Sequence, residues 1–398
     1  MIALEEHPEK MDAYKLLANY LQTIIRKSEF GKPVLQPWWI LEDTAQVWPL
    51  IENLASRIDT DGLTGVCALA DSGIPIGVPL AQALEMPCYV YRRKMWSLDD
   101  IPGPQHVVPR LSSESTITLV DSHIATGFTV SACLNYFSEQ NISVKHVVAP
   151  LSIVPKRYLP FRETGIEYVI LQDYVAKDAV ADLLFGIKGV QRANLEQDFP
   201  SLIRSYAEEI DDTGYLLSKK ERLKLIAKSY ITRSSIPILN PYNEDLAKDL
   251  RLAFDSRDSK VWEFFSKPDL VKRACLSVPE VINLDKIDII VGTGEIGTIF
   301  ALCVAYHCKF TGMILTTLER GLEWYYQENN SKRKRVLVCS GRLKTGQYLL
   351  GAKKRMSRLG LEIDSILALR YTPEEVRRPR NRLVTAVKEL ESQIFIMS

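Results

Sequence analysis

One stretch of the sequence occurs twice in altered form, and this repeat constrains the fold more than any other feature. TITLVDSHIATGFTV, residues 116–130, aligns without a gap with RVLVCSGRLKTGQYL, residues 335–349. In this alignment Thr126 corresponds to Thr345, at an offset of 219 residues. Each stretch begins as an apolar run typical of a buried strand and passes through a polar turn into a helical pattern. We interpret the two as copies of one strand–turn–helix unit and expect a duplicated architecture.

The rest of the sequence follows the same alternation of strands and helices. In the first half we expect strands over 65–70, 88–94, 116–121, 144–150 and 166–172, and helices over 12–27, 44–58, 74–85 and up to Tyr136. In the second half we expect helices around 243–275 and through Cys308, and strands over 286–292, 312–318, 335–341 and 363–371. Such alternation implies parallel sheets flanked by helices, so we predict an α/β fold.

The domain organisation follows from the chain length and from the segment between the halves. A chain of 398 residues suggests two or three domains, and 46% apolar residues suffice to bury their cores. Residues 178–236 carry charged helical patterns, which we interpret as a helical linker or cap. We therefore predict an N-terminal domain over 1–177 and a C-terminal domain with a basic tail over 237–398.

Residues 121–129 predict a site for a sugar phosphate. Asp121 follows a buried strand at its carboxyl end, where open α/β sheets bind ligands, and its carboxylate can accept ribose hydroxyls or face a magnesium ion. The residues that open the next helix can cradle a phosphate with backbone N–H groups and hydroxyls; they are Ala125, Thr126, Gly127, Phe128 and Thr129. An ordinary strand–turn–helix with a threonine N-cap accounts for the same residues.

This stretch resembles the phosphoribosyl-pyrophosphate (PRPP) signature of the type I phosphoribosyltransferases, a hydrophobic run followed by acids and a Thr-Gly loop. Residues 70–94, ADSGIPIGVPLAQALEMPCYVYRRK, are similar to the pyrophosphate loop and the following helix and strand of orotate phosphoribosyltransferases. Residues 95–114, which we predict to be a long loop, fall where that family has its mobile catalytic lid. The resemblance implies two type I phosphoribosyltransferase-like domains joined by a helical segment, the second being degenerate.

The same resemblance implies a magnesium-dependent transfer, in which a nucleobase-like nitrogen nucleophile bonds to the anomeric carbon of PRPP and pyrophosphate leaves. Residues 125–129 would hold the 5′-phosphate, and Asp121 would bind the ribose hydroxyls and Mg²⁺. Arg93 and Lys94 would offset the charge of the pyrophosphate, so these two cations and Asp121 are the expected catalytic residues. The turn expected to contact the pyrophosphate consists of Asp71, Ser72 and Gly73.

The sequence departs from the family pattern in the acid pair and in the lid. Ser122 stands in place of the second acid, as in uracil phosphoribosyltransferases, which also lack it. The lid contains no lysine, so only His106 and Arg110 can serve there. His123 can point at the site, although a packing role explains it more simply.

The second copy has lost the acid and carries a rival motif. Ser340 and Gly341 replace the acidic end of the strand, Thr345-Gly346 remains, Gln347-Tyr348 follows, and Arg342 and Lys344 can still attract an anion. IDIIVGTGEIGTIFAL contains G-x-G-x-x-G at Gly292, Gly294 and Gly297, with Glu319 after the next strand, which fits a dinucleotide fingerprint. The repeat argues against that fingerprint, because Gly297 aligns with Gly73 of the pyrophosphate turn at an offset of 224 residues.

Three functions are therefore carried forward, with an enzyme favoured: PRPP-dependent phosphoribosyl transfer, a non-catalytic PRPP or nucleotide sensor acting with a partner, and a dinucleotide-binding protein.

The distribution of charge along the chain is compatible with a binding partner. The formal net charge of +1 combines +10 over Ser331–Ser398, from 16 Lys and Arg against 6 Asp and Glu, with −9 elsewhere. Such asymmetry can mark a partner protein, a nucleic acid or another anionic partner at the basic C-terminal region, although a solvated basic face explains it more simply. A dimer is compatible with this organisation.

The expected compartment is the cytoplasm. The start, MIALEEHPEK, is acidic and lacks the apolar segment of a signal peptide, and the longest apolar stretch is about half of what a membrane span needs, so we expect no membrane partner. The seven cysteines are scattered and lie mostly in apolar runs, which predicts buried thiols.

Overall fold

The computed structural model describes residues 25–27, 33–35, 37–69, 72–92, 106–124, 127–152, 166–172, 246, 249–250, 260–316, 334–341, 356, 361–370 and 393–397. The chain divides into two compact units. The first holds the described residues up to 172 together with Phe265–Pro268, and the second holds the other described residues. The predicted helical segment 178–236 and both predicted domain boundaries lie outside the described residues.

The first unit is built on a seven-stranded sheet. The strand order is β5-β4-β3-β6-β8-β7, and β9 also pairs with β8. All pairs are parallel except β4 with β5. The strands are β3 (Gly65–Leu69), β4 (Cys88–Arg92), β5 (His106–Val108), β6 (Thr116–Val120), β7 (His123–Ile124), β8 (Ser143–Ser152) and β9 (Glu167–Gln172).

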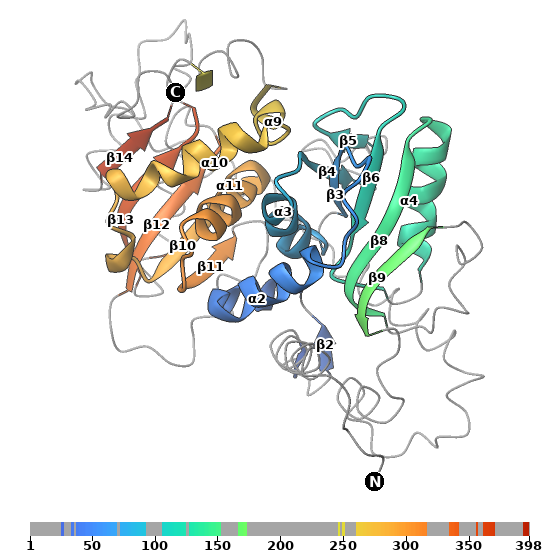
Figure 1. The fold of residues 1–398 in the computed structure, drawn as a ribbon. Helices are drawn as coiled ribbons and strands as arrows, with labels where there is room; N and C mark the ends of the chain where they lie inside the picture. The colour runs from blue at the N-terminus through green and yellow to red at the C-terminus, as the bar shows by residue number, and fades with distance from the viewer. Residues whose placement is uncertain are drawn as a thin grey trace, which may run out of the picture. The chain divides into compact units, whose positions relative to one another are not determined.

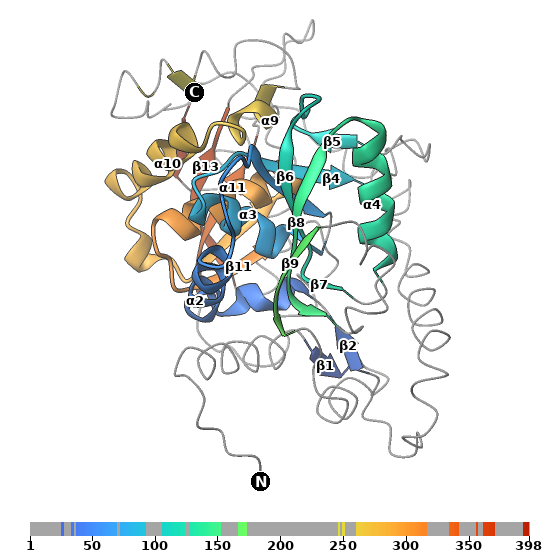
Figure 2. The same cartoon turned by 45° about the vertical axis from the view of Figure 1, so that its right-hand side comes forward.

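Helices cover both faces of this sheet. Helix α4 (Phe128–Glu139) lies on one face, and α2 (Thr44–Ala55) and α3 (Ile74–Ala83) lie on the other (Figures 1 and 2). Because neighbouring residues of a strand point to opposite faces, Leu119 packs in the core with α4, while Val120 faces α3. The central strands are therefore buried on both sides, which explains their continuous apolar runs.

The second unit contains a five-stranded parallel sheet, ordered β11-β10-β12-β13-β14. The strands are β10 (Ile289–Thr293), β11 (Met313–Thr316), β12 (Lys334–Ser340), β13 (Leu361–Ala368) and β14 (Gln393–Ile396). Its helices include α9 (Lys260–Phe264), α10 (Pro268–Leu276) and α11 (Gly294–His307), with short 3-10 turns at Val278–Glu280 and Leu284–Lys286. The two parallel sheets with their flanking helices confirm the predicted α/β fold.

The two sheets share one strand order. In both units the first strand lies between the second and third, followed by the fourth and fifth: β4-β3-β6-β8-β9 corresponds to β11-β10-β12-β13-β14. The register agrees as well. Ala68 pairs with Val120, and at the corresponding place Gly292 pairs with Cys339, at the two offsets expected from the sequence. The duplication itself stays a prediction.

Two local expectations were wrong. The segment predicted as a continuous lid loop contains β5, whose His106–Val108 backbone pairs antiparallel with the edge strand β4. The helix predicted over 12–27 does not reach its end, because β1 (Ile25–Lys27) pairs antiparallel with β2 (Pro33–Leu35). In both places pairing with another strand outweighs the local periodicity. The remainder of that predicted helix lies outside the described residues.

The cysteine side chains agree with the prediction of buried thiols. Six of the seven cysteine side chains are buried and Cys308 is partly buried. Burial raises the pKa of Cys88 to about 12 and that of Cys308 to about 11, so both are protonated thiols near neutral pH. In the described part of the chain, no helix has the length and apolarity that crossing a membrane requires.

Candidate functional site

The strand order places a topological switch point at the carboxyl ends of β3 and β6. From β3 the chain continues to β4, which lies on one side of β3, whereas β6 and β8 lie on the other side. The connections that leave β3 and β6 therefore run in opposite directions. Open parallel sheets bind ligands at such a topological switch point. The turn at Ser72 and Gly73 follows β3, and Asp121 follows β6. The structure therefore brings together two segments that the sequence predicts to be parts of one site.

A hydrogen bond joins these two segments directly. The Ser72 hydroxyl donates to Oδ1 of Asp121 over 2.7 Å, and the backbone N–H of Ser122 donates to the same oxygen over 2.7 Å. The backbone N–H of Asp121 donates to the carbonyl of Val148, which extends the pairing of β6 with β8. Asp121 is only 7% exposed. Its carboxylate is thus held in a fixed position at the switch point.

The electrostatics of the site suit a ligand that donates hydrogen bonds. Burial raises the pKa of Asp121, although nearby His123 and the hydrogen bonds from Ser72 and Ser122 lower it in part. Burial also lowers the pKa of His123, against the attraction of Asp121. A carboxylate that has lost water is stabilised by further donors or by a cation, so ribose hydroxyls and Mg²⁺ both fit it chemically.

Two glycines shape the backbone around Asp121. A Cβ on Gly73 would lie 2.4 Å from the carbonyl oxygen of Val120 and 2.8 Å from the backbone N and O of Leu69, so this turn packs directly on the end of β6. Gly127 precedes α4 with a φ of +78°, in the left-handed region that favours glycine. Glycine is therefore needed at 73 for the packing of the turn on the sheet and at 127 for the backbone conformation before α4.

The structure describes some of the predicted site residues and not others. Those described are Ser72, Gly73, Asp121, Gly127, Phe128 and Thr129, whereas Asp71, Arg93, Lys94, Ala125 and Thr126 lie outside the described residues. The roles assigned to all of them stay predictions. Sequence reasoning missed the Ser72–Asp121 bond, because no local pattern signals a contact between residues so far apart in the chain.

The position of the missing second acid is occupied by a buried hydroxyl. Ser122 is completely buried, and its Oγ lies 2.9 Å from Nδ1 of His123. Among the described residues no group of three histidine, cysteine or acidic side chains could hold a metal ion. Mg²⁺ is commonly held by one or two carboxylates together with substrate phosphates.

The corresponding point of the second unit has different side chains. Ile296 stands where the first unit has Ser72, and a Cβ on Gly341 would lie 2.1 Å from its Cγ2. The Thr293 hydroxyl donates to the carbonyl of Cys339 across the same gap, over 3.0 Å. Ser340 at the end of β12 is buried. The second unit therefore has neither the hydroxyl of Ser72 nor the carboxylate of Asp121 at the corresponding positions, Ile296 and Ser340. Arg342, Lys344, Thr345, Gly346, Gln347 and Tyr348 lie outside the described residues.

The G-x-G-x-x-G motif has a packing explanation. A Cβ on Gly292 would lie 2.3 Å from Cα of Thr298, and one on Gly297 would lie 2.6 Å from the carbonyl oxygen of Cys339. Gly294 has a φ of +63° where α11 begins. The glycines therefore let α11 pack closely on β10 and β12. Glu319, the expected ribose-binding acid of a dinucleotide site, lies outside the described residues.

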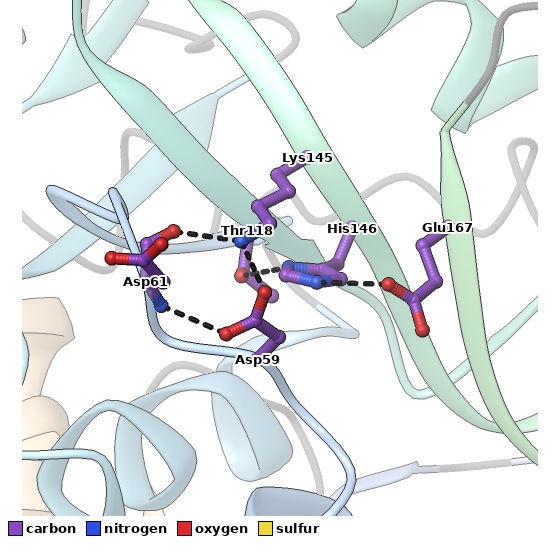
Figure 3. A network of polar contacts seen from close by, with 6 residues as sticks. All are labelled: Asp59, Asp61, Thr118, Lys145, His146 and Glu167. Atoms are coloured by element: carbon purple, nitrogen blue, oxygen red, sulfur yellow. Dashed lines mark hydrogen bonds and ion pairs between the residues drawn. The ribbon is translucent and has the colours of Figure 1, made fainter.

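A second polar cluster lies toward the amino ends of the strands (Figure 3). His146 on β8 is completely buried between its register partners, Thr118 on β6 and Glu167 on β9. Its Nδ1 lies 3.2 Å from Oγ1 of Thr118, and its Nε2 lies 3.4 Å from Oε2 of Glu167. The imidazole thus connects three parallel strands.

The neighbouring lysine ties a loop to the same strands. Nζ of Lys145 donates to Oδ2 of Asp59 and to the carbonyl of Asp61, both over 2.7 Å (Figure 3). Burial and the charge of Lys145 lower the pKa of His146, although Glu167 and Asp59 raise it in part. His146 is therefore neutral near pH 7, and we interpret this cluster as structural.

Acid is expected to destabilise the fold through His146. Because the pKa of His146 is lower in the folded chain than in the unfolded one, the unfolded chain takes up a proton first as the pH falls below about 6.5. The free energy of unfolding then falls by at most about 1.4 kcal/mol per pH unit from this group, until the folded-state pKa is passed. In His146→Asn, which keeps a polar group near Thr118, urea unfolding between pH 7.5 and 5 should lose this part of the pH dependence; an unchanged slope would contradict the assignment.

Comparison with known proteins gives partial matches. No protein-family model matches the sequence. Over 115 residues the chain is 25% identical to a hypoxanthine/guanine phosphoribosyltransferase of Aciduliprofundum boonei, a match that takes in 27% of this chain and 62% of that protein. The chain thus spans less than two thirds of the length of this curated relative. The predicted resemblance to phosphoribosyltransferases is confirmed at this level.

Solved structures similar to the chain include two phosphoribosyltransferases. Orotate phosphoribosyltransferase from Aeropyrum pernix has 15% identity and a TM-score of 0.33, over 43% of this chain and 97% of that chain. Adenine phosphoribosyltransferase from Leishmania donovani has 17% identity and a TM-score of 0.30, over 40% of this chain and 80% of that chain.

Proposed function

We propose that the first unit binds PRPP at the β3/β6 switch point and transfers its phosphoribosyl group to a nucleobase-like nitrogen. The observation that carries this proposal is the hydrogen bond from Ser72 to Asp121, which joins the expected pyrophosphate turn to the expected ribose acid. The sequence similarity to a hypoxanthine/guanine phosphoribosyltransferase supports it. The identity of the base is left open.

In the proposed reaction, a nitrogen lone pair forms a bond to the anomeric carbon as the bond from that carbon to the pyrophosphate oxygen breaks. The electron pair of the broken bond leaves with the pyrophosphate, and the nitrogen releases its proton to water. The Asp121 carboxylate accepts hydrogen bonds from the ribose hydroxyls and stabilises the positive charge that develops on the ring. The N–H groups that begin α4 bind the 5′-phosphate. Mg²⁺ bound to the substrate would offset the charge of the leaving group, with Asp121 as its carboxylate contact.

A non-catalytic sensor is the second candidate. It is favoured by Ser122, whose buried hydroxyl stands where the family pattern has a second acid, so that one carboxylate remains for the ribose. Such a protein would bind PRPP through the same residues and release no pyrophosphate. The basic C-terminal region would then be a candidate surface for a partner.

One pair of measurements separates these candidates. The full chain is melted with PRPP and Mg²⁺, with NAD and with free bases, and pyrophosphate release is then followed across a panel of bases. A melting temperature raised by PRPP together with release supports the enzyme, and a raised melting temperature without release supports the sensor. No stabilisation by PRPP contradicts both, and stabilisation by NAD alone would favour the dinucleotide reading of Gly292–Gly297.

Glycine at the start of α4 is expected to be necessary for phosphate binding. In Gly127→Ala, the φ of +78° strains an alanine by about 1–2 kcal/mol and shifts the N–H groups that follow. Gly62→Ala is the matched control, because Gly62 has a φ of +70° and nothing lies within 4 Å of an added Cβ. We expect a similar loss of unfolding free energy in both variants and at least a tenfold loss of PRPP affinity in Gly127→Ala alone, measured by calorimetry. Equal affinities would contradict this role.

A further inference from the structure

Ser72 occupies an unusual position between the two halves of the proposed ligand. We propose that its hydroxyl exchanges partners, donating to Asp121 in the empty site and to a phosphate oxygen of the pyrophosphate group when PRPP is bound. Binding of the pyrophosphate group would thereby free the Asp121 carboxylate to accept hydrogen bonds from the ribose hydroxyls. Ser72 would in this way couple the two ends of the ligand. This inference rests on the proposed function and adds a selectivity mechanism to it.

The backbone next to Ser72 is fixed by packing, whereas its side chain is held by the hydrogen bond to Asp121 alone among the contacts between described residues. Gly73 packs on the end of β6 with no room for a Cβ, and its N–H donates to the carbonyl of Leu69 over 2.7 Å. Gly73 therefore anchors the end of the turn beside Asp121. Ser72 itself is half-buried, and a serine side chain moves its hydroxyl between three staggered positions by rotating about one bond. A change of partner needs only that rotation.

The carboxylate has a reason to hold the hydroxyl in the absence of ligand. Asp121 is nearly buried, and burial raises its pKa, so its charge depends on the donors around it. Hydrogen bonds to charged groups are among the stronger ones in proteins. A ribose hydroxyl that takes the place of Ser72 must therefore displace an existing bond. Only a ligand with a pyrophosphate group offers the displaced hydroxyl a new charged partner.

The second unit lacks the serine–aspartate pair at the corresponding positions. Ile296 stands at the place of Ser72 and contacts Gly341, and β12 ends in Ser340 instead of an acid. The hydroxyl and the carboxylate are therefore present together in the first unit and absent together at the corresponding positions of the second. This pairing is expected if the two side chains act on one another.

The test compares three ligands on the full chain by titration calorimetry: PRPP, ribose 5-phosphate and inorganic pyrophosphate, each with Mg²⁺. In Ser72→Ala the affinity for ribose 5-phosphate should rise about fivefold, because Asp121 is no longer masked, and the affinity for pyrophosphate should fall about fivefold. Coupling free energies between sites commonly correspond to factors of about 5–150. Ser72→Thr retains the hydroxyl and should stay close to wild type. Ser56→Ala, which removes a hydroxyl bonded to the carbonyl of Asn53, should change neither affinity.

The opposite signs of the two effects distinguish this inference from simpler roles. If Ser72→Ala weakens both partial ligands alike, Ser72 is a plain contact residue and the exchange is refuted. Unchanged affinities in a variant with an unchanged melting temperature would show a packing role and also refute it. Wild-type binding of PRPP decides the proposed function separately, since that binding can succeed while the exchange fails.

Discussion

Pyrophosphate release is expected to fall about 100-fold or more in Asp121→Asn, while the first unit stays at least as stable as in the wild type. The loss of activity follows because an amide carries no charge to stabilise the developing cation or to attract Mg²⁺. The stability follows from the pKa. Since burial raises the pKa of Asp121 in the folded chain, the stability linked to this group is full below its unfolded value of 3.8 and is lost as the pH rises through the folded value. The charged form therefore costs stability near neutral pH, and asparagine removes that cost.

Asp61→Asn is the matched control for this substitution. Asp61 is exposed, and it contacts Lys145 through its backbone carbonyl, so the change should leave both release and melting temperature near wild type. Release is measured under saturating PRPP and base, and stability by thermal melting without ligand. Asp121→Asn protein that retains full release would refute the role of Asp121, and one that melts far below wild type would contradict the stated effect of its burial.

The second large effect is expected at Gly73. An alanine there would place its Cβ 2.4 Å from the carbonyl oxygen of Val120, next to Asp121, and the turn must move to admit it. Overpacking of this kind typically costs about 1–3 kcal/mol. Because the displaced turn carries Ser72, we expect Gly73→Ala to lose PRPP binding beyond detection as well as stability.

Gly297→Ala makes the corresponding change in the second unit. Its Cβ would lie 2.6 Å from the carbonyl oxygen of Cys339, so a comparable loss of unfolding free energy is expected there. The site, however, lies in the first unit, and PRPP affinity per folded molecule should be unchanged. Calorimetric melting and titration of both variants check this contrast. Equal loss of binding in the two would contradict the assignment of the site to the first unit.

Much of the fold could be predicted from local patterns. The apolar runs of β3, β6, β8 and β10 and the helices α3 and α11 follow the sequence within a few residues, because buried parallel strands are nearly uniform apolar runs. The strands β5 and β1 could not be predicted. Each is three residues long and depends on an antiparallel partner strand elsewhere in the chain. Local hydrophobic periodicity contains no information about such a partner.

The candidate site was predicted in its parts. Asp121, the turn at Ser72 and Gly73, and the glycine before α4 were all identified from motif order and residue chemistry. What the motifs did not contain was their connection: the bond from Ser72 to Asp121, the packing of Gly73 on Val120, and the contact of Ser122 with His123. The contact of Ile296 with Gly341 in the second unit was equally hidden, because neither residue belongs to a recognisable motif.

The sequence by itself determined the α/β class, the matching order of elements in both halves and the residue types at the switch point, because periodicity and turn chemistry act over short stretches of chain. Only the tertiary structure decided which side chains meet at each switch point. In the first unit the Ser72 hydroxyl bonds to the Asp121 carboxylate, whereas in the second unit Ile296, at the place of Ser72, contacts Gly341. Such a meeting is set by strand order and register, which bring the two segments together only when the sheet has formed.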